Sequence, residues 1–441
     1  MTIRASRRAA ACALALASCL AGMTAIAGPA AQGWRTAALT SFDDAWQTIH
    51  DSFYDPAFGG LDWAAARAEL RPRVEAATSP EDARAVIREL LARLKRSHFA
   101  LLSASAADAL PGPAAVPIDV RVIADEAVIT RVADPDAARA GLAAGQILLA
   151  VDGQPVGRAI ADDEAVDAST RHREHWRRVN RTLHGADGSR VSLQVREADG
   201  RERQVAAIRT MSRGDVVTLG NLVLRVAFDS RETRTPAGRR AGVIAFSVWM
   251  ASVNEPIAAA VDRFRQHDGI VIDLRGNPGG LAAMMSGVAG HFIAEPIVLG
   301  TMQTRQVPLT FRVNPRLVTA DGRAVAVFGG PVAILVDELT GSTSETFAGS
   351  MQGLGRARVF GRRTMGQALP AMTKRLATGD VLMYAIGDFT TAGGRSLEGA
   401  GVVPDVPVPL SIRALSEGRD EVLEAALRWF DAGKSRPRGR D

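Results

Sequence analysis

The sequence predicts an α/β protein with three parts: an N-terminal helical region, a β-rich domain and an open, mostly parallel α/β core. Apolar residues recur at helical spacing within residues 36–103, and short strands separated by turn signals fill residues 116–208. Strands alternate with helices through residues 209–413, the order typical of a parallel sheet. A chain of 441 residues is too long for one ordinary core, so several domains are expected.

Residues 1–27 have the pattern of a signal peptide. Three arginines precede an apolar run from Ala9 to Ile26, and the small residues Ala25 and Ala27 suit cleavage after Ala27. The stretch from Leu16 to Cys19 offers an alternative, cleavage before Cys19 with lipidation of that cysteine. We therefore expect export to the periplasm or the exterior, with membrane attachment only if Cys19 is lipidated.

Cysteine content and charge exclude several functions. Cys12 and Cys19 are the two cysteines and both lie in the leader, so the mature chain has no disulfide or thiolate chemistry. The net charge is +5, but residues 1–27 and 434–441 each carry +3, which leaves −1 for the body. Nucleic-acid binding therefore lacks its main electrostatic argument.

The N-terminal helical region has a well-defined helix start at Ser79. A capping hydroxyl is followed by Pro80 and by two acids, Glu81 and Asp82, which favour the positive end of a helix dipole. An apolar face follows at helical spacing: Val86, Ile87, Leu90, Leu91 and Leu94. This helix leads directly into Ser97 and His98.

The β-rich domain is expected to contain strands over residues 116–122, 127–132 and 147–151, and a further pair of strands between Asp-Gly turns. A polar helical insertion over residues 160–184 divides it. The insertion carries three histidines: His172, His175 and His184. We interpret them as part of an exposed polar helix, because a zinc site needs more ligands than this cluster offers.

The core is expected to contain strands over residues 242–248, 269–274 and 332–336, with a helix from Asn254 to about residue 266. Ligands of such sheets bind beyond the carboxyl ends of the strands, where Gly279-Gly280 and Ser342 fall. Residues 414–441 are expected to form a C-terminal helix and a disordered tail.

Ser342 lies where a buried strand turns into a helix, in the stretch GSTSE. A serine at such a turn is surrounded by backbone N–H groups and by the positive end of the helix, which suit an oxyanion. The alternative is that Ser342 or Thr343 merely caps the helix. A cap needs no activating base, so the presence of a base decides between the two interpretations.

Several motifs resemble a known family. GSTSETFAGSMQGLGRARVFGRRTMG resembles the nucleophile segment of the carboxyl-terminal processing peptidases and their tricorn-type relatives, which implies that Ser342 is the nucleophile. VIDLRGNPGG and GRSLEGAGVVPDVPV resemble the glycine-bearing strand end and the closing motif of that family. The run VITRVADPDAARAGLAAGQILLAVDGQPV resembles a PDZ domain. The resemblance implies a crotonase-like core and covers most of the mature chain.

The resemblance also indicates the base. Many members use a lysine after a glycine, but this position is Gln367, whose amide cannot accept a proton. The tricorn branch uses a Ser-His pair, matched here by Ser97 and His98, and histidine titrates near neutrality. Glu398 matches the acid that acts through this serine, although it could also be a turn acid. Glu345 is expected to favour the helix start and is the second candidate for an active-site acid.

The oxyanion donors are expected to be the N–H of Thr343 and a glycine N–H from Gly279 or Gly280. Glycine suits this position because the reacting carbonyl must approach the backbone closely.

The resemblance to PDZ domains implies that the substrate's C-terminal segment is added as a strand beside Val116, Ile118 and Val120. The carboxylate-binding loop is expected at residues 116–119, although the usual glycine is absent.

The sequence thus predicts an exported serine endopeptidase that acts on unfolded or C-terminally recognised proteins, without a metal or organic cofactor. Gln367 leaves open an alternative, a non-catalytic peptide- or ligand-binding protein on the same fold. An esterase is a third interpretation, but the predicted peptide-binding domain argues against it. The oligomeric state is not indicated by the sequence.

Overall fold

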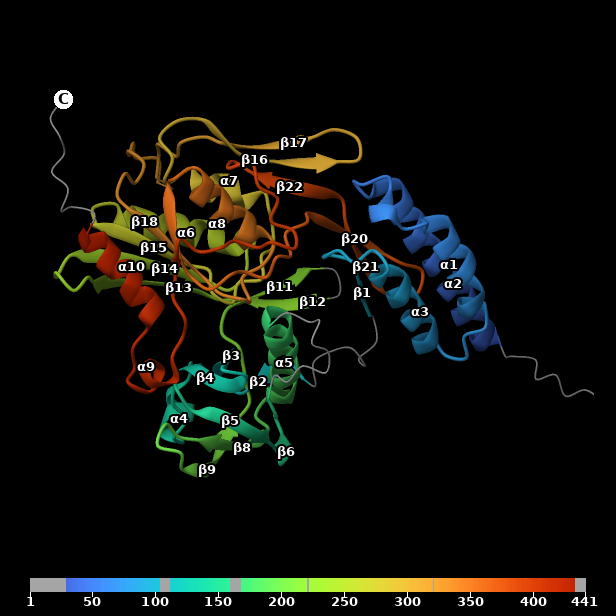
Figure 1. Cartoon of the computed structure of the whole chain (residues 1–441), viewed down its shortest axis with the longest axis horizontal. Helices are drawn as coiled ribbons and strands as arrows, with labels where there is room; N and C mark the ends of the chain where they lie inside the picture. Colours follow the sequence, from blue (N-terminus) through green and yellow to red (C-terminus); the bar gives the residue numbers. More distant parts are fainter. Residues whose placement is uncertain (1–28, 104–111, 159–167, 220–221, 320, 433–441) are drawn as a thin grey trace, which may run out of the picture.

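The computed structural model describes residues 29–103, 112–158, 168–219, 222–319 and 321–432. The predicted signal peptide, Cys12, Cys19 and residues 433–441 lie outside the described residues, as does the first part of the predicted insertion. Figure 1 shows three parts: helices α1 to α3 at one side, a β-rich domain below and a large α/β core. The mixed α/β fold with N-terminal helices is therefore confirmed.

Three helices form the N-terminal region: α1 (Pro29–Ser52), α2 (Trp63–Glu75) and α3 (Pro80–Ala92). They pack around a common apolar core that includes Phe42, Leu70 and Ile87. The predicted start of α3 is confirmed: Ser79 Oγ accepts the Asp82 N–H at 3.1 Å, and the Asp82 carboxylate accepts the Ser79 N–H at 3.0 Å.

The β-rich domain is built on an antiparallel sheet of order β3-β4-β5-β8-β9. Its strands are β3 (Ile118–Ile123), β4 (Glu126–Val132), β5 (Ile147–Val151), β8 (Arg190–Arg196) and β9 (Glu202–Ile208), with β6 (Gln154–Pro155) beside β5. Helices α4 (Pro135–Arg139) and α5 (Ala168–Leu183) complete it, and α5 lies against β3 and β4.

Helix α5 is not simply an exposed polar helix. His175 is fully buried, so its predicted exposure is wrong. Val179 and Leu183 on the same helix also belong to the apolar core of the β-rich domain. The reason is that α5 packs against β3 and β4, so one side of the helix must face the domain core.

Three small β elements surround these parts. They are the sheet of β2 (Ala114–Ala115), β7 (His184–Gly185) and β10 (Thr210–Met211), the hairpin of β11 (Asp215–Leu219) and β12 (Leu222–Val226), and the sheet of β16 (Ile297–Thr304), β17 (Leu309–Val313) and β22 (Gly387–Thr391).

The core is a six-stranded sheet of order β13-β14-β15-β18-β19-β23. Its strands are β13 (Phe228–Arg234), β14 (Arg240–Phe246), β15 (Gly269–Asp273), β18 (Val332–Val336), β19 (Ala357–Gly361) and β23 (Val406–Pro407). Only the β13–β14 pairing of this sheet is antiparallel. The five residues of β18 are all buried, as expected for a strand covered on both faces.

Helices cover both faces of this sheet (Figure 1). Helices α6 (Asn254–Phe264), α7 (Met284–Ala289) and α8 (Thr343–Gly353) share one apolar core with strand residues such as Ile272 and Ile334. Helix α10 (Glu421–Ala432) packs on the alternate residues, including Val271 and Leu335, and short α9 (Ile412–Ser416) precedes it. No helix among the described residues is both long and apolar enough to span a membrane.

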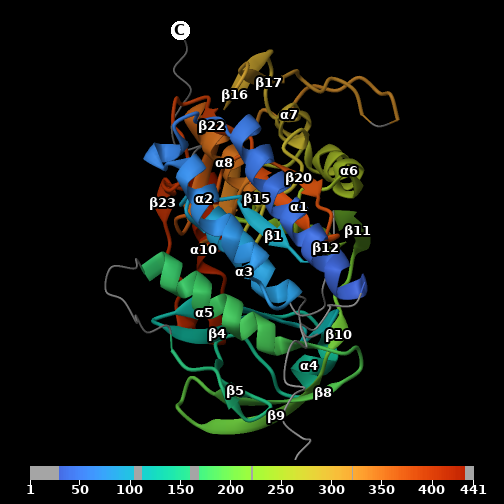
Figure 2. The ribbon, with the colours of Figure 1, turned by 90° about the vertical axis from the view of Figure 1, so that its right-hand side faces the viewer.

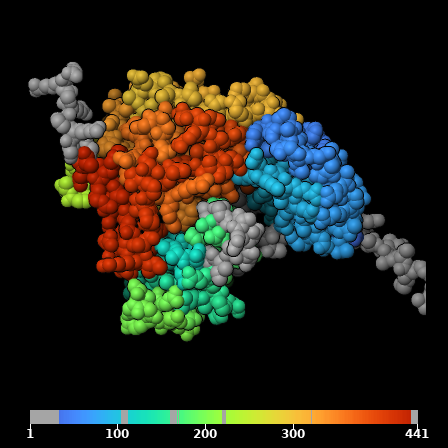
Figure 3. All heavy atoms as spheres, viewed as in Figure 1, coloured from blue at the N-terminus to red at the C-terminus, as the bar shows by residue number. Residues whose placement is uncertain are grey.

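A hairpin joins the helical region to the core. It consists of β20 (Ala371–Arg375) and β21 (Val381–Ala385), and β21 pairs antiparallel with β1 (Ala100–Leu102), which follows the N-terminal helices. In Figure 1 this small sheet lies between the N-terminal helices and the core, and in Figure 2 the helices face the viewer with β1 beside them. Figure 3 shows the helices, in blue, as a lobe that meets the core along this boundary.

A buried ion pair strengthens this junction. Arg84 Nε on α3 lies 3.1 Å from the Asp380 carboxylate at the hairpin turn, and the Asp380 side chain is fully buried. Lys374 Nζ on β20 also lies 3.3 Å from the Asp44 carboxylate on α1. The helical region is therefore fixed against the hairpin, and with it the start of β1.

Removing the buried carboxylate should weaken the fold. Asp380→Ala leaves Arg84 without its buried partner, and we expect the free energy of unfolding to fall by about 3 kcal/mol. Chemical denaturation measures this change. The control is Asp199→Ala, which breaks an exposed pair with Arg201 (2.7 Å) and should lower the free energy of unfolding much less. Equal losses in the two variants would contradict this role of the buried pair.

Candidate active site

Ser342 lies at the carboxyl end of β18, immediately before α8, in a backbone conformation that is unusual for a residue with a side chain. Its φ is 51° and its ψ is −121°, which places it in the left-handed half of the map. Its N–H donates to Gln367 O at 2.8 Å and to a Glu345 carboxylate oxygen at 3.1 Å. These bonds stabilise the strained backbone conformation of Ser342. A serine that only capped the helix would not require this conformation.

His98 reaches Ser342 from the other end of the chain. Its Nε2 lies 3.2 Å from Ser342 Oγ, although the two residues are 244 positions apart. His98 also has a positive φ, 61°, and lies two residues before β1, so the β1–β21 pairing sets its position.

Ser97 and Glu398 continue this line of contacts. Ser97 Oγ lies 2.8 Å from His98 Nδ1 and donates to Glu398 Oε2 at 2.8 Å, while the Ser97 N–H donates to Glu398 Oε1 at 2.8 Å. If Nδ1 carries the ring proton, each hydroxyl can donate in one direction, from Ser342 to His98 and from Ser97 to Glu398. The structure thus brings the four predicted residues together.

The electrostatics favour neutral His98. Burial lowers the pKa of His98, and the nearby negative charge of Glu398 opposes that shift in part. A neutral imidazole is the form that can accept a proton from a hydroxyl.

Glu345 is more closely involved in this site than a dipole effect would require. Its carboxylate is completely buried and accepts bonds from Ser342 N, Thr364 Oγ1, Gly366 N and Gln367 N. Burial raises the pKa of Glu345 to about 7, against the opposing effect of these hydrogen bonds. Glu345 therefore lies behind the nucleophile and supports its backbone.

The candidate oxyanion donors differ in availability. The Gly279 N–H already donates to Asn277 Oδ1 at 3.0 Å, so the prediction that it could serve as a donor is not supported. Among the described residues, the N–H groups of Gly280 and Thr343 have no hydrogen-bond partner. Gly279 has a steric role instead: a Cβ there would lie 2.6 Å from Ser342 Cβ.

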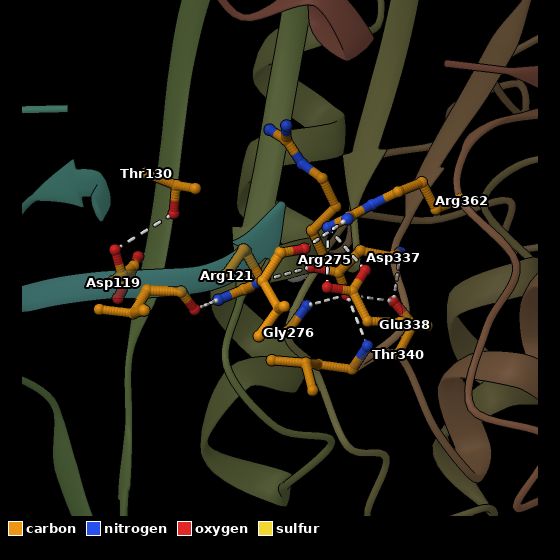
Figure 4. Close-up of polar contacts among 12 residues, drawn as sticks. Asp119, Arg121, Thr130, Arg275, Gly276, Asp337, Glu338, Thr340 and Arg362 are labelled. Atoms are coloured by element: carbon orange, nitrogen blue, oxygen red, sulfur yellow. Dashed lines mark hydrogen bonds and ion pairs between the residues drawn. The ribbon is translucent and has the colours of Figure 1, made fainter. Parts of the chain in front are cut away.

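Asp337 ties together the two loops that carry these groups (Figure 4). Its carboxylate accepts the N–H of Gly276 at 2.8 Å and that of Leu339 at 3.1 Å. Arg121 from β3 of the β-rich domain completes the cluster, with Nε 2.8 Å from Asp337. Burial would raise the pKa of Asp337, but Arg121 and Arg362 hold that pKa below its usual value.

The predicted peptide-binding residues have buried side chains. Val116, Ile118 and Val120 are buried in the core of the β-rich domain, so their side chains do not line a binding surface. The Val116 N–H donates to Leu183 O at 3.1 Å, and the Ile118 N–H donates to Val116 O at 2.7 Å. The N–H groups of Val116 and Ile118 are therefore already used within the domain and are not free to bind a carboxylate.

Two residues of the site were not predicted, Asn277 and Asp337. Asn277 holds the glycine loop through Gly279 and donates from Nδ2 to Phe246 O at 2.8 Å. An Asn two residues before a glycine is a turn signal, so the sequence offered a hint of this role. The pairing of Asp337 with Arg121 joins distant segments, and no local pattern could have indicated it.

Comparisons with known proteins agree with this architecture. Residues 240–408 match peptidase family S41, and residues 36–92 match the tricorn protease C1 domain. The chain is 25% identical over 400 residues to a carboxyl-terminal-processing protease of Synechocystis sp., covering 88% of this chain and 86% of the relative. It is 26% identical to a putative tricorn protease homolog 2 of Streptomyces coelicolor, covering 91% of this chain and 32% of that longer protein.

Solved structures share the fold. The photosystem II D1 C-terminal processing protease superposes with a TM-score of 0.54 at 20% identity, covering 86% of this chain and 97% of the other. Mature CPAF superposes with a TM-score of 0.62 at 13% identity, covering 91% and 99% of the two chains.

Together these findings define a serine-type peptidase. Residues 240–408 match an S41 peptidase domain, and a tricorn-type C1 domain over residues 36–92 precedes it. The interpretation as a non-catalytic binding protein, which depended on Gln367, is thereby set aside.

Gly279→Ala should impair the site by displacing Ser342. The residue has a φ of +105°, and the added methyl group would also meet Thr343 N at 2.8 Å, so we expect peptidase activity to fall ~10²-fold. Cleavage of an unfolded protein substrate measures the effect. Gly153→Ala is the matched control, because Gly153 has a φ of +77° but open space around its Cβ position. Similar losses in both variants would mean that backbone strain, and not the clash, is responsible.

Proposed function

We propose that the protein is an exported serine endopeptidase in which Ser342 is the nucleophile and His98 the general base. The observation that carries this proposal is the 3.2 Å contact between His98 Nε2 and Ser342 Oγ. Gln367 removes the lysine used elsewhere in the family, and His98 supplies the missing base.

In the first step Ser342 Oγ attacks the carbonyl carbon of the scissile peptide bond, and the hydroxyl proton passes to His98 Nε2. The carbonyl oxygen becomes negative, and the N–H groups of Gly280 and Thr343 are the donors proposed to stabilise it. The C–N bond then breaks, and His98 returns the proton to the leaving amine. This leaves an acyl group on Ser342.

In the second step His98 takes a proton from water, and the resulting hydroxide attacks the acyl-enzyme. The ester bond breaks, the proton returns to Ser342 Oγ, and the peptide leaves with a new carboxylate. Ser97 and Glu398 act as positioning residues: Glu398 fixes Ser97, and Ser97 Oγ at 2.8 Å from Nδ1 fixes the imidazole.

Substrates are proposed to be proteins with an unfolded or recognisable C-terminal segment. Relatives are named carboxyl-terminal-processing and tail-specific proteases. We propose that the β-rich domain over residues 116–208 is PDZ-like and that the outer edge of β3, the edge strand next to α5, receives the segment through its backbone. Because the buried side chains of β3 face the core of the β-rich domain, selectivity for the substrate segment would come from the backbone edge of β3 and from α5.

Export is proposed from the leader pattern of residues 1–27, with lipidation at Cys19 as a variant of the same route. The proposed organisation of the mature chain is a helical region (36–103), the PDZ-like domain, a crotonase-like peptidase core (209–413) and a C-terminal segment.

A serine-directed fluorophosphonate probe tests the assignment. Ser342→Ala should lose labelling, and His98→Ala should label ~10²- to 10⁴-fold more slowly because the hydroxyl lacks its base. His50→Ala is the matched control, since His50 lies on α1 and interacts with Asp51. Labelling of Ser342→Ala at the wild-type rate, or an equal effect of the two histidine variants, would refute the proposal.

A further inference from the structure

The loop of residues 364–368 lies between the two halves of the proposed site. It follows β19 and includes Gln367, which stands where the resemblance to carboxyl-terminal processing peptidases leads one to expect a lysine. The Gln367 amide has no role in the mechanism proposed above. The loop nevertheless makes an unusual set of backbone contacts, and they involve both carboxylates of the site.

Three consecutive backbone N–H groups of this loop bind the two carboxylates. Gly366 N donates to Glu345 Oε1 at 2.6 Å and Gln367 N donates to Glu345 Oε2 at 3.0 Å. Ala368 N donates to Glu398 Oε2 at 3.0 Å. One short segment of backbone therefore bridges the carboxylate behind the nucleophile and the carboxylate behind the base.

The remaining contacts connect this bridge to the reacting groups. Gln367 O accepts the Ser342 N–H at 2.8 Å, and Glu345 Oε2 accepts the same N–H at 3.1 Å. On the other side, Glu398 binds both the N–H and the hydroxyl of Ser97 at 2.8 Å. Moving the loop would therefore shift Ser342 relative to His98.

Thr364 fixes the beginning of the loop. Its Oγ1 donates to Glu345 Oε1 at 2.5 Å and accepts the Val402 N–H at 2.7 Å, which links the loop to the closing motif. Gly366 has a φ of +70°, and its carbonyl accepts the Gly399 N–H at 2.9 Å, next to Glu398. The backbone turn at Gly366 thus suits glycine and is held from both sides.

We propose that residues 364–368 form a backbone clamp, with Glu345 as its positioning residue, that sets the distance between Ser342 and His98. This inference rests on the proposed function and adds a further positioning residue to it. At the position of the family's lysine, Gln367 therefore acts through its backbone N–H and carbonyl, which help to orient the nucleophile. His98 supplies the base.

The surroundings of Glu345 make its ionisation a specific readout. Its four hydrogen-bond partners are uncharged, and Ser344 and Thr346 beside it on α8 bond to Trp249 and Met285. The charged side chains of the adjoining loop point elsewhere: Arg362 pairs with Glu338, and Arg363 binds the carbonyl of Ala400. Two titratable groups across the site, His98 and Glu398, are joined to it through Ser342 and through the clamp.

Only the ionised carboxylate can accept all four bonds, so the clamp should weaken as Glu345 is protonated. Burial raises the pKa of Glu345 to about 7, whereas burial lowers the pKa of His98. In the wild type the rate of labelling should therefore rise with pH around 7, following Glu345. Without a titrating group at residue 345, the rise should move to lower pH and follow His98.

The experiment measures fluorophosphonate labelling rates of the full chain from pH 5 to 9, with kcat and KM for an unfolded protein substrate. Glu345→Gln places an amide NH₂ opposite backbone donors, and we expect labelling ~10- to 100-fold slower, a lower kcat at similar KM and the shifted pH profile. Thr364→Val should be impaired in the same way, and Thr364→Ser, which keeps the hydroxyl, should recover most of the rate. Glu295→Gln, an exposed carboxylate, is the matched control.

The outcomes distinguish a failure of the clamp from a failure of the proposed function. Labelling of Glu345→Gln at the wild-type rate with an unchanged pH profile overturns the clamp but leaves Ser342 and His98 in place. Labelling of Ser342→Ala as in the wild type refutes the proposed function and the clamp with it. If Glu345→Gln fails to fold by circular dichroism, the Thr364 pair decides: equal rates for the valine and serine variants contradict the inference.

Discussion

The pairing of β1 with β21 is the constraint on which the active site depends. His98 is supplied by the N-terminal region and Ser342 by the core, and neither segment is near the other in sequence. The antiparallel pairing, with Ala100 opposite Met383, fixes the chain two residues after His98. The Arg84–Asp380 ion pair and the apolar contacts of α3 then hold the helices against the same hairpin. The base is thus positioned by tertiary structure and not by local sequence.

The nucleophile depends on a second constraint, the strained turn at Ser342. A positive φ at a residue with a side chain is unfavourable and persists only where surrounding contacts determine it. Here those contacts are a buried carboxylate, a loop carbonyl and the space left by Gly279. Burying Glu345 is costly in itself, and its four hydrogen bonds offset that cost. The turn and the carboxylate therefore stabilise each other, so that changing either one should weaken the other.

Much of the architecture could be predicted from sequence because it follows from local patterns. The start of α3, the buried β18 and the alternation of strands and helices all leave periodic or capping signals. The residues brought together around Ser342 were indicated by motifs of the family, and their roles remain proposals. Sequence could not show whether the N–H groups at residues 116–118 and at Gly279 are free to bind a ligand, because local sequence does not reveal which donors already have partners in the fold. Arg121 and Asp337 come from different domains, and their contact follows only from the assembled fold.

The most direct test of the central claim is a crystal structure of the protein inactivated by a peptidyl phosphonate, which mimics the tetrahedral intermediate. We expect phosphorus bonded to Ser342 Oγ, a phosphonyl oxygen about 2.7–3.1 Å from the N–H groups of Gly280 and Thr343, and His98 Nε2 within hydrogen-bond distance of Ser342 Oγ. An adduct on another residue, or His98 turned away from the modified serine while β1 remains paired with β21, would contradict it.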